Sequence, residues 1–550
     1  MPMHVARGGE WMITETQEVL LGDEAVALGA VHAGITAAYA YPGTPSTEIV
    51  EYLIGYGKRH GGPRAAWCTN EKTAYEGAMG VSFAGKRALV AMKHVGLNVA
   101  ADPFVNSAIV SINGGLVVAV ADDPGMHSSQ NEQDTRYLVD FARVICLEPA
   151  NQQEAYDMTR EALDLSEKFQ IPVVLRLVTR LAHSRGAVTL GSQREQNPVA
   201  KVSDPRSWIL LPVNARRQWH ELLQRQKEIE AYTESCPHNT LFLSDERRDF
   251  GVITTGIARN YYLENIDGLK RVPSHLHVGA YPLPLAKIRK LVGHVEKVLV
   301  LEEGYPFLER QLRGITSSPV EIMGKMSGHV APEGELDPDI VRAALKLEPR
   351  RGTELAGITL PKRPPQLCSG CPHADAYNAI KEALSEYDET VVTSDIGCYT
   401  LGALPPYSAI ETCVCMGASI GIARGAAAAG LRPVLAVIGD STFLHSGVTP
   451  LMDCAAENAD MTLIILDNEA VAMTGGQQPL LPSRKLRDIC LGVGVDPSHM
   501  HVVEVHPRKK DELVQVLKRE IDHHGLSVVI AHRTCLEMAK KLKKEKKDAR

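Results

Sequence analysis

The chain has 550 residues, of which 44% are hydrophobic and 23% charged, and its net charge of −7 gives no reason to expect nucleic acid or a membrane surface as a partner. This length predicts about three or four domains with sizeable cores. The 11 cysteines are too sparse for a secreted disulfide scaffold, and neither a leader pattern nor a membrane-spanning apolar run is apparent, so we expect a cytoplasmic protein without a membrane span.

The first expected domain, residues 18–190, follows an N-terminal tail (1–17) and alternates helices and strands as a doubly wound parallel sheet does. A helix over 24–33 and a strand over 37–41 lead into the turn Pro-Gly-Thr-Pro-Ser, which contains Thr44. This turn is either a plain capped connection from strand to helix or a turn at the ligand-binding end of the sheet.

The rest of this domain carries an acidic residue at a helix start and a long polar loop. Glu71 opens an expected helix, where an acidic residue is ordinarily only a partner of the helix dipole. A polar loop that contains His127 follows a buried strand, and long loops of this kind are often functional. The expected helices and strands of this part are 71–84, 88–92, 115–121, 151–168 and 171–177.

The middle of the chain is predicted to hold a smaller domain between two connections. Residues 191–245 are polar and are expected to form a linker with a covering helix. A smaller α/β unit is expected over 246–345, and a linker rich in proline and basic residues over 346–366. The pair Glu302-Glu303 lies at a strand end, where we expect a solvated turn without a catalytic role.

Two apolar runs dominate the last expected domain, residues 367–540, which precedes a basic tail (541–550). Both runs are typical of buried parallel strands; one stops at Gly439-Asp440-Ser441 and the other at Asp467-Asn468. Because parallel sheets bind ligands beyond the carboxyl ends of their strands, Asp440 and Asn468 are expected to lie together there.

This pattern resembles the thiamine diphosphate signature, although ordinary strand ends with turn residues are the alternative. A carboxylate and an amide oxygen suit Mg²⁺, so the expected ligands are Asp440, Asn468 and the backbone carbonyl of Ala470. Gly439 permits close approach of a diphosphate, and Ser441 stands where the signature usually has glycine. Thiamine also needs a carboxylate on its pyrimidine ring, and Glu71 is the candidate for this role.

Four cysteines are placed where they could share a site. Cys368 and Cys371 form a C-x-x-C pair, and Cys398 and Cys535 each follow an expected strand of the same domain. Four thiolates are the ligand set of a [4Fe–4S] cluster. The alternatives are a zinc half-site or redox pair for C-x-x-C, with Cys398 and Cys535 as small buried residues.

Taken together, these motifs resemble the large (alpha) subunit of indolepyruvate ferredoxin oxidoreductase, in the 2-oxoacid:ferredoxin oxidoreductase superfamily. The resemblance covers nearly all of residues 18–540. It implies a pyrimidine-binding domain, a transketolase-C-terminal-like domain and a diphosphate-binding domain, in that order. The stretches that carry it are AYPGTPSTE, NEKTAYE, MKHVGLNVAADP, VADDPGMHSSQNEQDTR, EAYDMTREALDLSEKF, CSGCPH, DIGCYTLGALPP, CMGASIG, VIGDSTFLHSG and LDNEAVAMTG.

The resemblance assigns roles to individual residues. It implies that Glu71 activates the pyrimidine, that Thr44 lies near the substrate carbonyl and that Met416 supports the bent cofactor. The four cysteines would hold the cluster proximal to thiamine. We further expect Lys93, His94 and His127 at the mouth of the active site.

The sequence departs from the family pattern in two respects. Relatives usually continue into a ferredoxin-like module with two C-x₂-C-x₂-C-x₃-C-P runs, whereas this chain ends in a lysine-rich tail, so those two clusters are expected to be absent. The family's smaller beta subunit is not fused here, so we expect a heterodimer or a dimer of heterodimers. Asp122-Asp123 stand where pyruvate-type relatives carry an arginine, which favours another acid, such as an arylpyruvate.

The favoured hypothesis is oxidative decarboxylation of a 2-oxo acid. The acyl group would pass to coenzyme A, and the electrons would leave through the cluster to ferredoxin or another carrier. The alternatives are a non-oxidative thiamine-dependent decarboxylase or carboligase, and a non-catalytic scaffold subunit.

Overall fold

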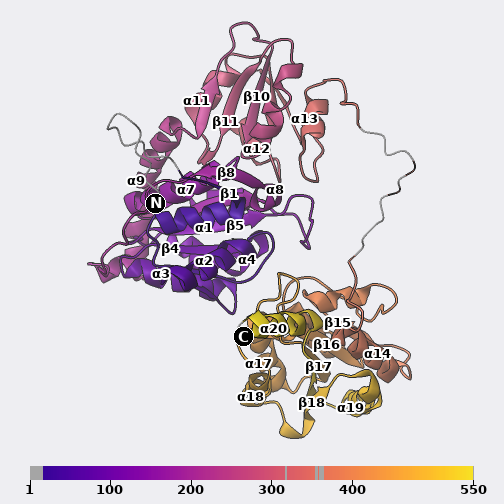
Figure 1. Ribbon diagram of the computed structural model, residues 1–550. Helices are drawn as coiled ribbons and strands as arrows, with labels where there is room; N and C mark the ends of the chain where they lie inside the picture. The colour runs from indigo at the N-terminus through magenta and orange to yellow at the C-terminus, as the bar shows by residue number, and fades with distance from the viewer. Residues whose placement is uncertain (1–15, 316–318, 353–356, 358, 360–364, 549–550) are drawn as a thin grey trace. The chain divides into compact units, whose positions relative to one another are not determined.

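The computed structural model describes residues 16–315, 319–352, 357, 359 and 365–548. The chain divides into two compact α/β units, Met1–Thr353 and Glu354–Arg550 (Figure 1). Most of the expected N-terminal tail and part of the expected linker over 346–366 lie outside the described residues. Within the described part of the chain, no helix is both long and apolar enough to cross a membrane.

The main sheet of the first unit has seven strands in the order β3-β2-β4-β5-β7-β6-β12. All are parallel except β12, which pairs antiparallel with β6. Every residue of β4, β5 and β7 is buried, as expected for apolar strands covered on both faces. The strands are β2 (Ala37–Ala40), β3 (Arg64–Trp67), β4 (Ala88–Lys93), β5 (Leu116–Asp122), β6 (Ile145–Leu147), β7 (Val173–Val178) and β12 (Ala280–Tyr281).

Helices connect these strands and cover the sheet, which confirms the predicted doubly wound α/β fold. The helices expected over 24–33, 71–84 and 151–168 are each present within two residues of their predicted ends. The helices are α1 (Gly22–His32), α2 (Thr47–His60), α3 (Glu71–Phe83), α4 (His94–Val99), α5 (Ala101–Ser107), α6 (Thr135–Ala142), α7 (Gln152–Phe169) and α8 (Thr179–His183).

A two-stranded antiparallel sheet brings the start of α1 next to the end of α8. It pairs β1 (Gln17–Leu21) with β8 (Arg185–Thr189), and Leu21 lies opposite Arg185. Gly22 is needed at the crossing, because a Cβ there would lie 2.2 Å from the carbonyl oxygen of Leu181.

A second sheet in the first unit takes four of its five strands from residues 246–345, and β9 precedes that range. Its order is β14-β13-β10-β11-β9, and only β9 runs antiparallel to its neighbour. The strands are β9 (Asn239–Phe242), β10 (Phe250–Thr255), β11 (Ser274–Val278), β13 (Lys297–Leu301) and β14 (Glu321–Met323). The helices are α9 (Pro212–Ser235), α10 (Ala258–Leu263), α11 (Leu285–Val292), α12 (Phe307–Ile315) and α13 (Pro338–Ala344).

The expectation of a solvated turn at Glu302-Glu303 is wrong, because both side chains are buried. Arg136 of α6 donates hydrogen bonds to the Glu302 carboxylate (2.9 Å) and to the Glu303 carbonyl (2.8 Å). A buried arginine thus compensates the charge at the end of β13 and joins the smaller domain to the first sheet. The short strand β12 also joins the two sheets, because its residues come from the smaller domain but pair with β6 of the main sheet.

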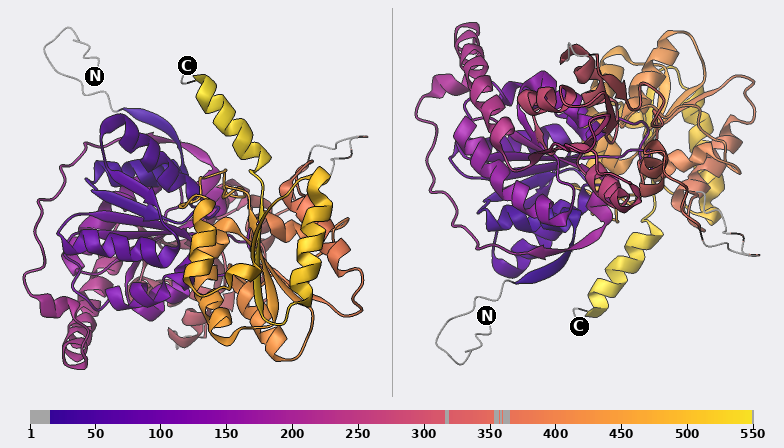
Figure 2. Two further views of the ribbon diagram at one scale, coloured as in Figure 1. Left: turned by 90° about the horizontal axis from the view of Figure 1, so that it is seen from below. Right: turned by 90° about the horizontal axis from the view of Figure 1, so that it is seen from above.

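The second unit has one parallel sheet in the order β15-β16-β17-β19-β18, with helices on both faces (Figure 2). Alternate residues of the central strands face two separate cores: Val437, Ile464 and Val529 face one, and Ile438, Ile465 and Val528 the other. The strands are β15 (Val391–Thr393), β16 (Val434–Gly439), β17 (Met461–Asp467), β18 (Met500–Glu504) and β19 (Leu526–His532).

The helix that follows β16 begins at Asp440 and is interrupted by a π-helical turn. It starts as α16 (Asp440–Thr442), passes through a π-helical turn (Phe443–Gly447) and continues as α17 (Val448–Glu457). The other helices of this unit are α14 (Pro372–Leu384), α15 (Ala418–Ala428), α18 (Arg484–Gly492), α19 (Lys510–Asp522) and α20 (Leu536–Asp548).

Candidate active site

Glu71 lies at the carboxyl edge of the main sheet in the first unit. It is the first residue of α3, directly after β3, and Asn70 caps this helix by accepting a hydrogen bond from the Thr73 amide at 2.9 Å. The Glu71 side chain is buried against α4, where a Cβ at Gly96 would lie 2.7 Å from the Glu71 carboxylate. Glycine at 96 therefore provides the room for this carboxylate.

The turn that contains Thr44 is joined to the polar loop that follows β5. The Ser128 hydroxyl donates a hydrogen bond to the Thr44 carbonyl at 3.4 Å, and the Lys93 ammonium donates to the Ser128 carbonyl at 2.8 Å. The Asp123 carboxylate accepts from the Ser128 amide at 2.8 Å. The loop thus folds back over the ends of β2 and β4. Burial lowers the pKa of Lys93 to about 8.

The two histidines expected at the mouth of the site differ in their surroundings. His94 begins α4 and is buried, and neither of its ring nitrogens has a hydrogen-bond partner among the described residues. It borders a cavity of about 490 Å³ that Asn98, Tyr137 and Arg310 also line. His127 is half-exposed, and its Nε2 lies 3.3 Å from a Glu335 carboxylate oxygen. Of the two histidines, only His94 borders this cavity.

Asp122 and Asp123 serve different internal partners. The Asp122 carboxylate accepts a hydrogen bond from the Arg176 guanidinium at 2.7 Å and is fully buried. Asp123 organises the polar loop through Ser128 and accepts from the Thr179 hydroxyl at 2.7 Å. Both carboxylates are therefore held by neighbouring side chains.

In the second unit, Asp440 and Asn468 lie at the ends of neighbouring strands, as predicted. Gly439 of β16 pairs with Leu466 of β17, and both polar side chains are buried. Burial and the nearby Asp467 carboxylate raise the pKa of Asp440 to about 8, and the buried Ser441 hydroxyl has no partner among the described residues. A crowded buried carboxylate beside an unpartnered hydroxyl fits a divalent cation with a phosphate.

Asn468 is held in one orientation by two neighbours. Its Oδ1 accepts a hydrogen bond from the Ala470 amide at 3.1 Å, and its Nδ2 lies 3.1 Å from Nε2 of His373. Burial lowers the pKa of His373 to about 4, so this imidazole is neutral and accepts from the amide group. Sequence reasoning missed His373, although it directly follows the C-x-x-C-P run.

The glycine of the Gly-Asp motif has a packing role that the sequence did not indicate. A Cβ at Gly439 would lie 2.5 Å from the ring of Tyr399. The Tyr399 hydroxyl donates to Asp395, which also accepts from the Ser419 hydroxyl at 2.6 Å. Burial raises the pKa of Asp395 to about 6. This network fixes the segment before Cys398 against α15.

Met416 is half-buried in the turn before α15. Gly417 follows it with φ of +83°, and a Cβ there would lie 2.5 Å from the Ser446 side chain. The left-handed backbone and the contact together require glycine. The turn places Met416 next to the π-helical segment that follows Asp440.

The four predicted cysteines come together in the second unit. The Cys371 amide donates to the Cys368 carbonyl at 3.0 Å, and the Arg533 guanidinium joins the segment of Cys535 to the Gly370 carbonyl at 2.9 Å. Burial, and then the three other thiols, raise the pKa of Cys398 to about 12. The Cys535 amide donates to the Asn468 carbonyl at 2.8 Å. The thiols therefore gather next to the strand end that carries Asn468.

Comparisons with known proteins agree with this arrangement. The model of the thiamine-binding region of pyruvate flavodoxin/ferredoxin oxidoreductases matches residues 28–218, and that of the C-terminal TPP-binding domain of thiamine pyrophosphate enzymes matches 395–531. Indolepyruvate oxidoreductase subunit IorA of Archaeoglobus fulgidus is 39% identical, with 94% of this chain and 86% of the relative covered. The IorA subunit of Thermococcus kodakarensis is 34% identical, with 94% and 85% covered.

The chain belongs to the indolepyruvate oxidoreductase alpha-subunit family. It is therefore an alpha subunit of a thiamine-dependent 2-oxoacid oxidoreductase, an enzyme of several subunits. The solved 2-oxoglutarate:ferredoxin oxidoreductase from Magnetococcus marinus shares the fold, with a TM-score of 0.51 at 18% identity over 62% of this chain and 66% of that chain. Within this family, the matched regions contain Thr44 and Glu71 in the first unit and Asp440 and Asn468 in the second.

Proposed function

We propose that this alpha subunit catalyses the oxidative decarboxylation of an arylpyruvate, such as indolepyruvate, to the acyl-CoA. The acid loses CO₂, the acyl group passes to coenzyme A, and two electrons leave singly through one [4Fe–4S] cluster to ferredoxin or another carrier. The name of the relatives supports an aryl substrate. Thiamine diphosphate, when bound, supplies the carbanion chemistry.

Residues of the second unit would hold the diphosphate end of this cofactor. Asp440, Asn468 and the Ala470 carbonyl would ligate Mg²⁺, next to a diphosphate near Gly439 and Ser441. Met416 would support the ring system. These assignments rest on burial, the crowded carboxylate and the unpartnered hydroxyl described above.

Residues of the first unit would act on the proton and on the substrate. Glu71 would hold a proton at the pyrimidine ring, because its buried carboxylate lies at the sheet edge. Thr44 would face the substrate carbonyl, with His94 and His127 nearer the mouth. The half-exposed His127 suits contact with an entering acid better than a place in the interior.

The observation that carries the proposal is the hydrogen bond from the Cys535 amide to the Asn468 carbonyl. It joins the four cysteines to an expected Mg²⁺ ligand, so an electron acceptor held by them would lie beside the cofactor. These cysteines are Cys368, Cys371, Cys398 and Cys535. Four thiolates are the ligand set of a [4Fe–4S] cluster.

A smaller beta subunit is the expected partner, in a heterodimer or a dimer of heterodimers. The experiment is anaerobic purification of both subunits, followed by iron, sulfide and thiamine analysis. We expect about four irons per alpha chain, in keeping with a four-cysteine ligand set. Cys535→Ala should lower the iron content and slow substrate-dependent dye reduction, whereas Cys490→Ala, at a buried cysteine in α18, should leave both unchanged. Iron-free protein that still releases CO₂ from indolepyruvate would make the enzyme a plain decarboxylase.

A further inference from the structure

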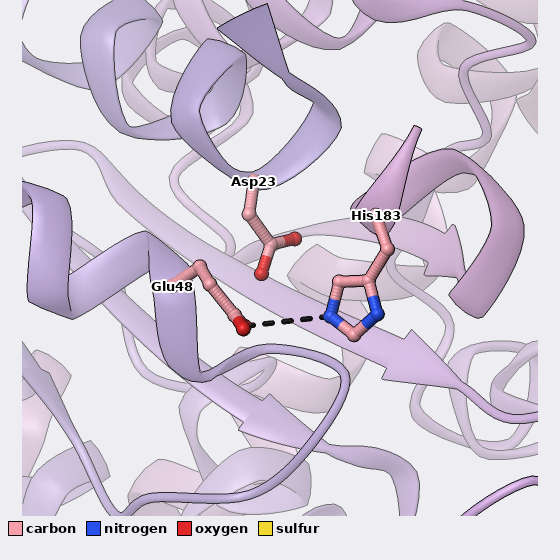
Figure 3. Close-up of side chains that lie close together, drawn as sticks. All are labelled: Asp23, Glu48 and His183. Atoms are coloured by element: carbon pink, nitrogen blue, oxygen red, sulfur yellow. Dashed lines mark ion pairs between the residues drawn. The ribbon is translucent and has the colours of Figure 1, made fainter. Parts of the chain in front are cut away.

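Three side chains outside the candidate active site converge between α1, α2 and α8 (Figure 3). One ligand atom each of Asp23, Glu48 and His183 lies within 4.8 Å of the others. Because Leu21 pairs with Arg185, residues 23 and 183 lie just beyond the same end of the β1–β8 ladder. Glu48 comes from the first turn of α2.

Asp23 is the unexplained member of this group. It is fully buried, and neither carboxylate oxygen has a hydrogen-bond partner among the described residues. Its carboxylate points into the space between Glu48 and His183 in Figure 3. Burial and the Glu48 carboxylate raise the pKa of Asp23 well above its ordinary value. A buried carboxylate without donors is costly, and a missing ion is a standard explanation.

Glu48 and His183 form the open side of the group. The His183 Nε2 lies 3.4 Å from Glu48 Oε2, and the two side chains are 35% and 36% exposed respectively. This close contact raises the pKa of His183 and lowers that of Glu48. An ion can therefore enter from solvent, with Asp23 at the closed end.

We propose that Asp23, Glu48 and His183 bind one divalent transition-metal cation of the Zn²⁺ type. Two carboxylate oxygens with one imidazole nitrogen are a ligand set that Zn²⁺ and its neighbours accept, whereas Mg²⁺ and Ca²⁺ prefer oxygen ligands alone. The two carboxylates match the charge of the cation when the imidazole is neutral. Three protein ligands leave a position for water on the exposed side.

The place of this site suggests what the cation does. Glu48 lies in the helix that starts directly after the turn of Thr44, and the Thr47 hydroxyl accepts a hydrogen bond from the Gly43 amide at 3.0 Å. A cation held by Glu48 would fix α2 to α1 and α8, and with it the base of this turn. Binding of this cation would not depend on thiamine or on a cluster.

The test uses the metal-free full chain with Co²⁺ as the probe. Cysteine-bound Co²⁺ shows a sulfur-to-metal charge-transfer band, which an Asp–Glu–His site lacks. We expect wild-type protein to bind one equivalent more than Asp23→Asn or His183→Ala, and the extra equivalent to add no charge-transfer band. Thermal midpoints should rise with Co²⁺ or Zn²⁺ in the wild type more than in these variants.

A matched control is available in the same unit. His238 and Glu161 form a similar pair at 2.6 Å, and no second carboxylate joins it among the described residues, so Glu161→Gln should retain the extra equivalent. Equal Co²⁺ binding by wild type and Asp23→Asn would overturn the proposal. If Asp23→Asn is then also as stable as metal-free wild type or more stable, Asp23 and Glu48 share a proton, because the asparagine amide group supplies the missing donor.

Discussion

The carboxylate of Glu71 depends on a single glycine in the neighbouring helix. We predict that Gly96→Ala displaces this side chain, because the added Cβ would lie 2.7 Å from the carboxylate. The variant should fold and bind thiamine diphosphate, but hydrogen–deuterium exchange at C2 of the cofactor should slow by an order of magnitude or more. Exchange is followed by proton NMR after acid quench.

Two control variants test whether the effect of Gly96→Ala acts through Glu71. Gly80→Ala, in α3, places a Cβ with nothing within 4 Å and should leave exchange unchanged. Glu71→Gln keeps the size of the side chain but cannot hold the proton, so it should bind cofactor and lose exchange. Wild-type exchange in Glu71→Gln would show that another carboxylate acts on the pyrimidine.

The buried Lys93 side chain should make folding stability depend on pH. Because burial lowers its pKa to about 8, the folded chain releases this proton at lower pH than an unfolded chain, whose lysines keep it up to about pH 10.4. The Lys93 contribution to folding stability should therefore improve as the pH rises from about 8 to 10. Competitive acetylation read by mass spectrometry should give a midpoint near pH 8 for Lys93; a midpoint near the ordinary value would contradict this.

Among the elements, two apolar strands of the second unit were predicted together with their carboxyl ends. The runs at Val434 and Leu463 became β16 and β17 with their expected ends, because consecutive apolar residues suit strands buried on both faces. The placement of Asp440 and Asn468 followed from parallel topology alone. The role of His373 could not be predicted in this way. Its contact with Asn468 joins the start of α14 to the end of β17, and a sequence pattern does not show such pairs.

Helix α14 thus connects the cysteine loop to the expected metal ligand. We predict that His373→Ala lowers retention of Mg²⁺–thiamine diphosphate by roughly 10–100-fold, the usual effect of losing a residue that orients a metal ligand. His373→Gln, which can still accept the hydrogen bond from Asn468, should recover part of it. Retention is measured as thiamine content after gel filtration, and Asp440→Ala sets the lower limit. Wild-type content in His373→Ala would remove His373 from this role.

On the scale of the first unit, a buried charge network joins its two sheets. Arg136 is almost fully buried and bonds to Asp134 at 2.9 Å and to Glu302 at 2.9 Å. The sequence predicts a solvated Glu302, because an acidic residue at a strand end is ordinarily exposed. The arginine that compensates its charge lies 166 residues away, and no sequence pattern links the two.

We predict that Arg136→Met destabilises the first unit by about 3–5 kcal/mol, since it leaves buried carboxylates without their partner. The thermal midpoint of the subunit, followed by circular dichroism, should fall. Arg206→Met, which breaks an exposed pair with Asp204, should leave the midpoint near that of wild type. Equal midpoints for both variants would show that the network does not join the sheets.

Strand β12 has a consequence for how such subunits can be recombined. Ala280 and Tyr281 come from the smaller domain but complete the edge of the first sheet, and the Tyr281 hydroxyl donates to Glu148 at 2.6 Å. A chimera that exchanges residues 246–345 for those of a relative would therefore also replace an edge strand of its host. The border at which these two folds can be exchanged does not follow the linker, so a working hybrid must keep the host residues around 280–281 or exchange both sheets together.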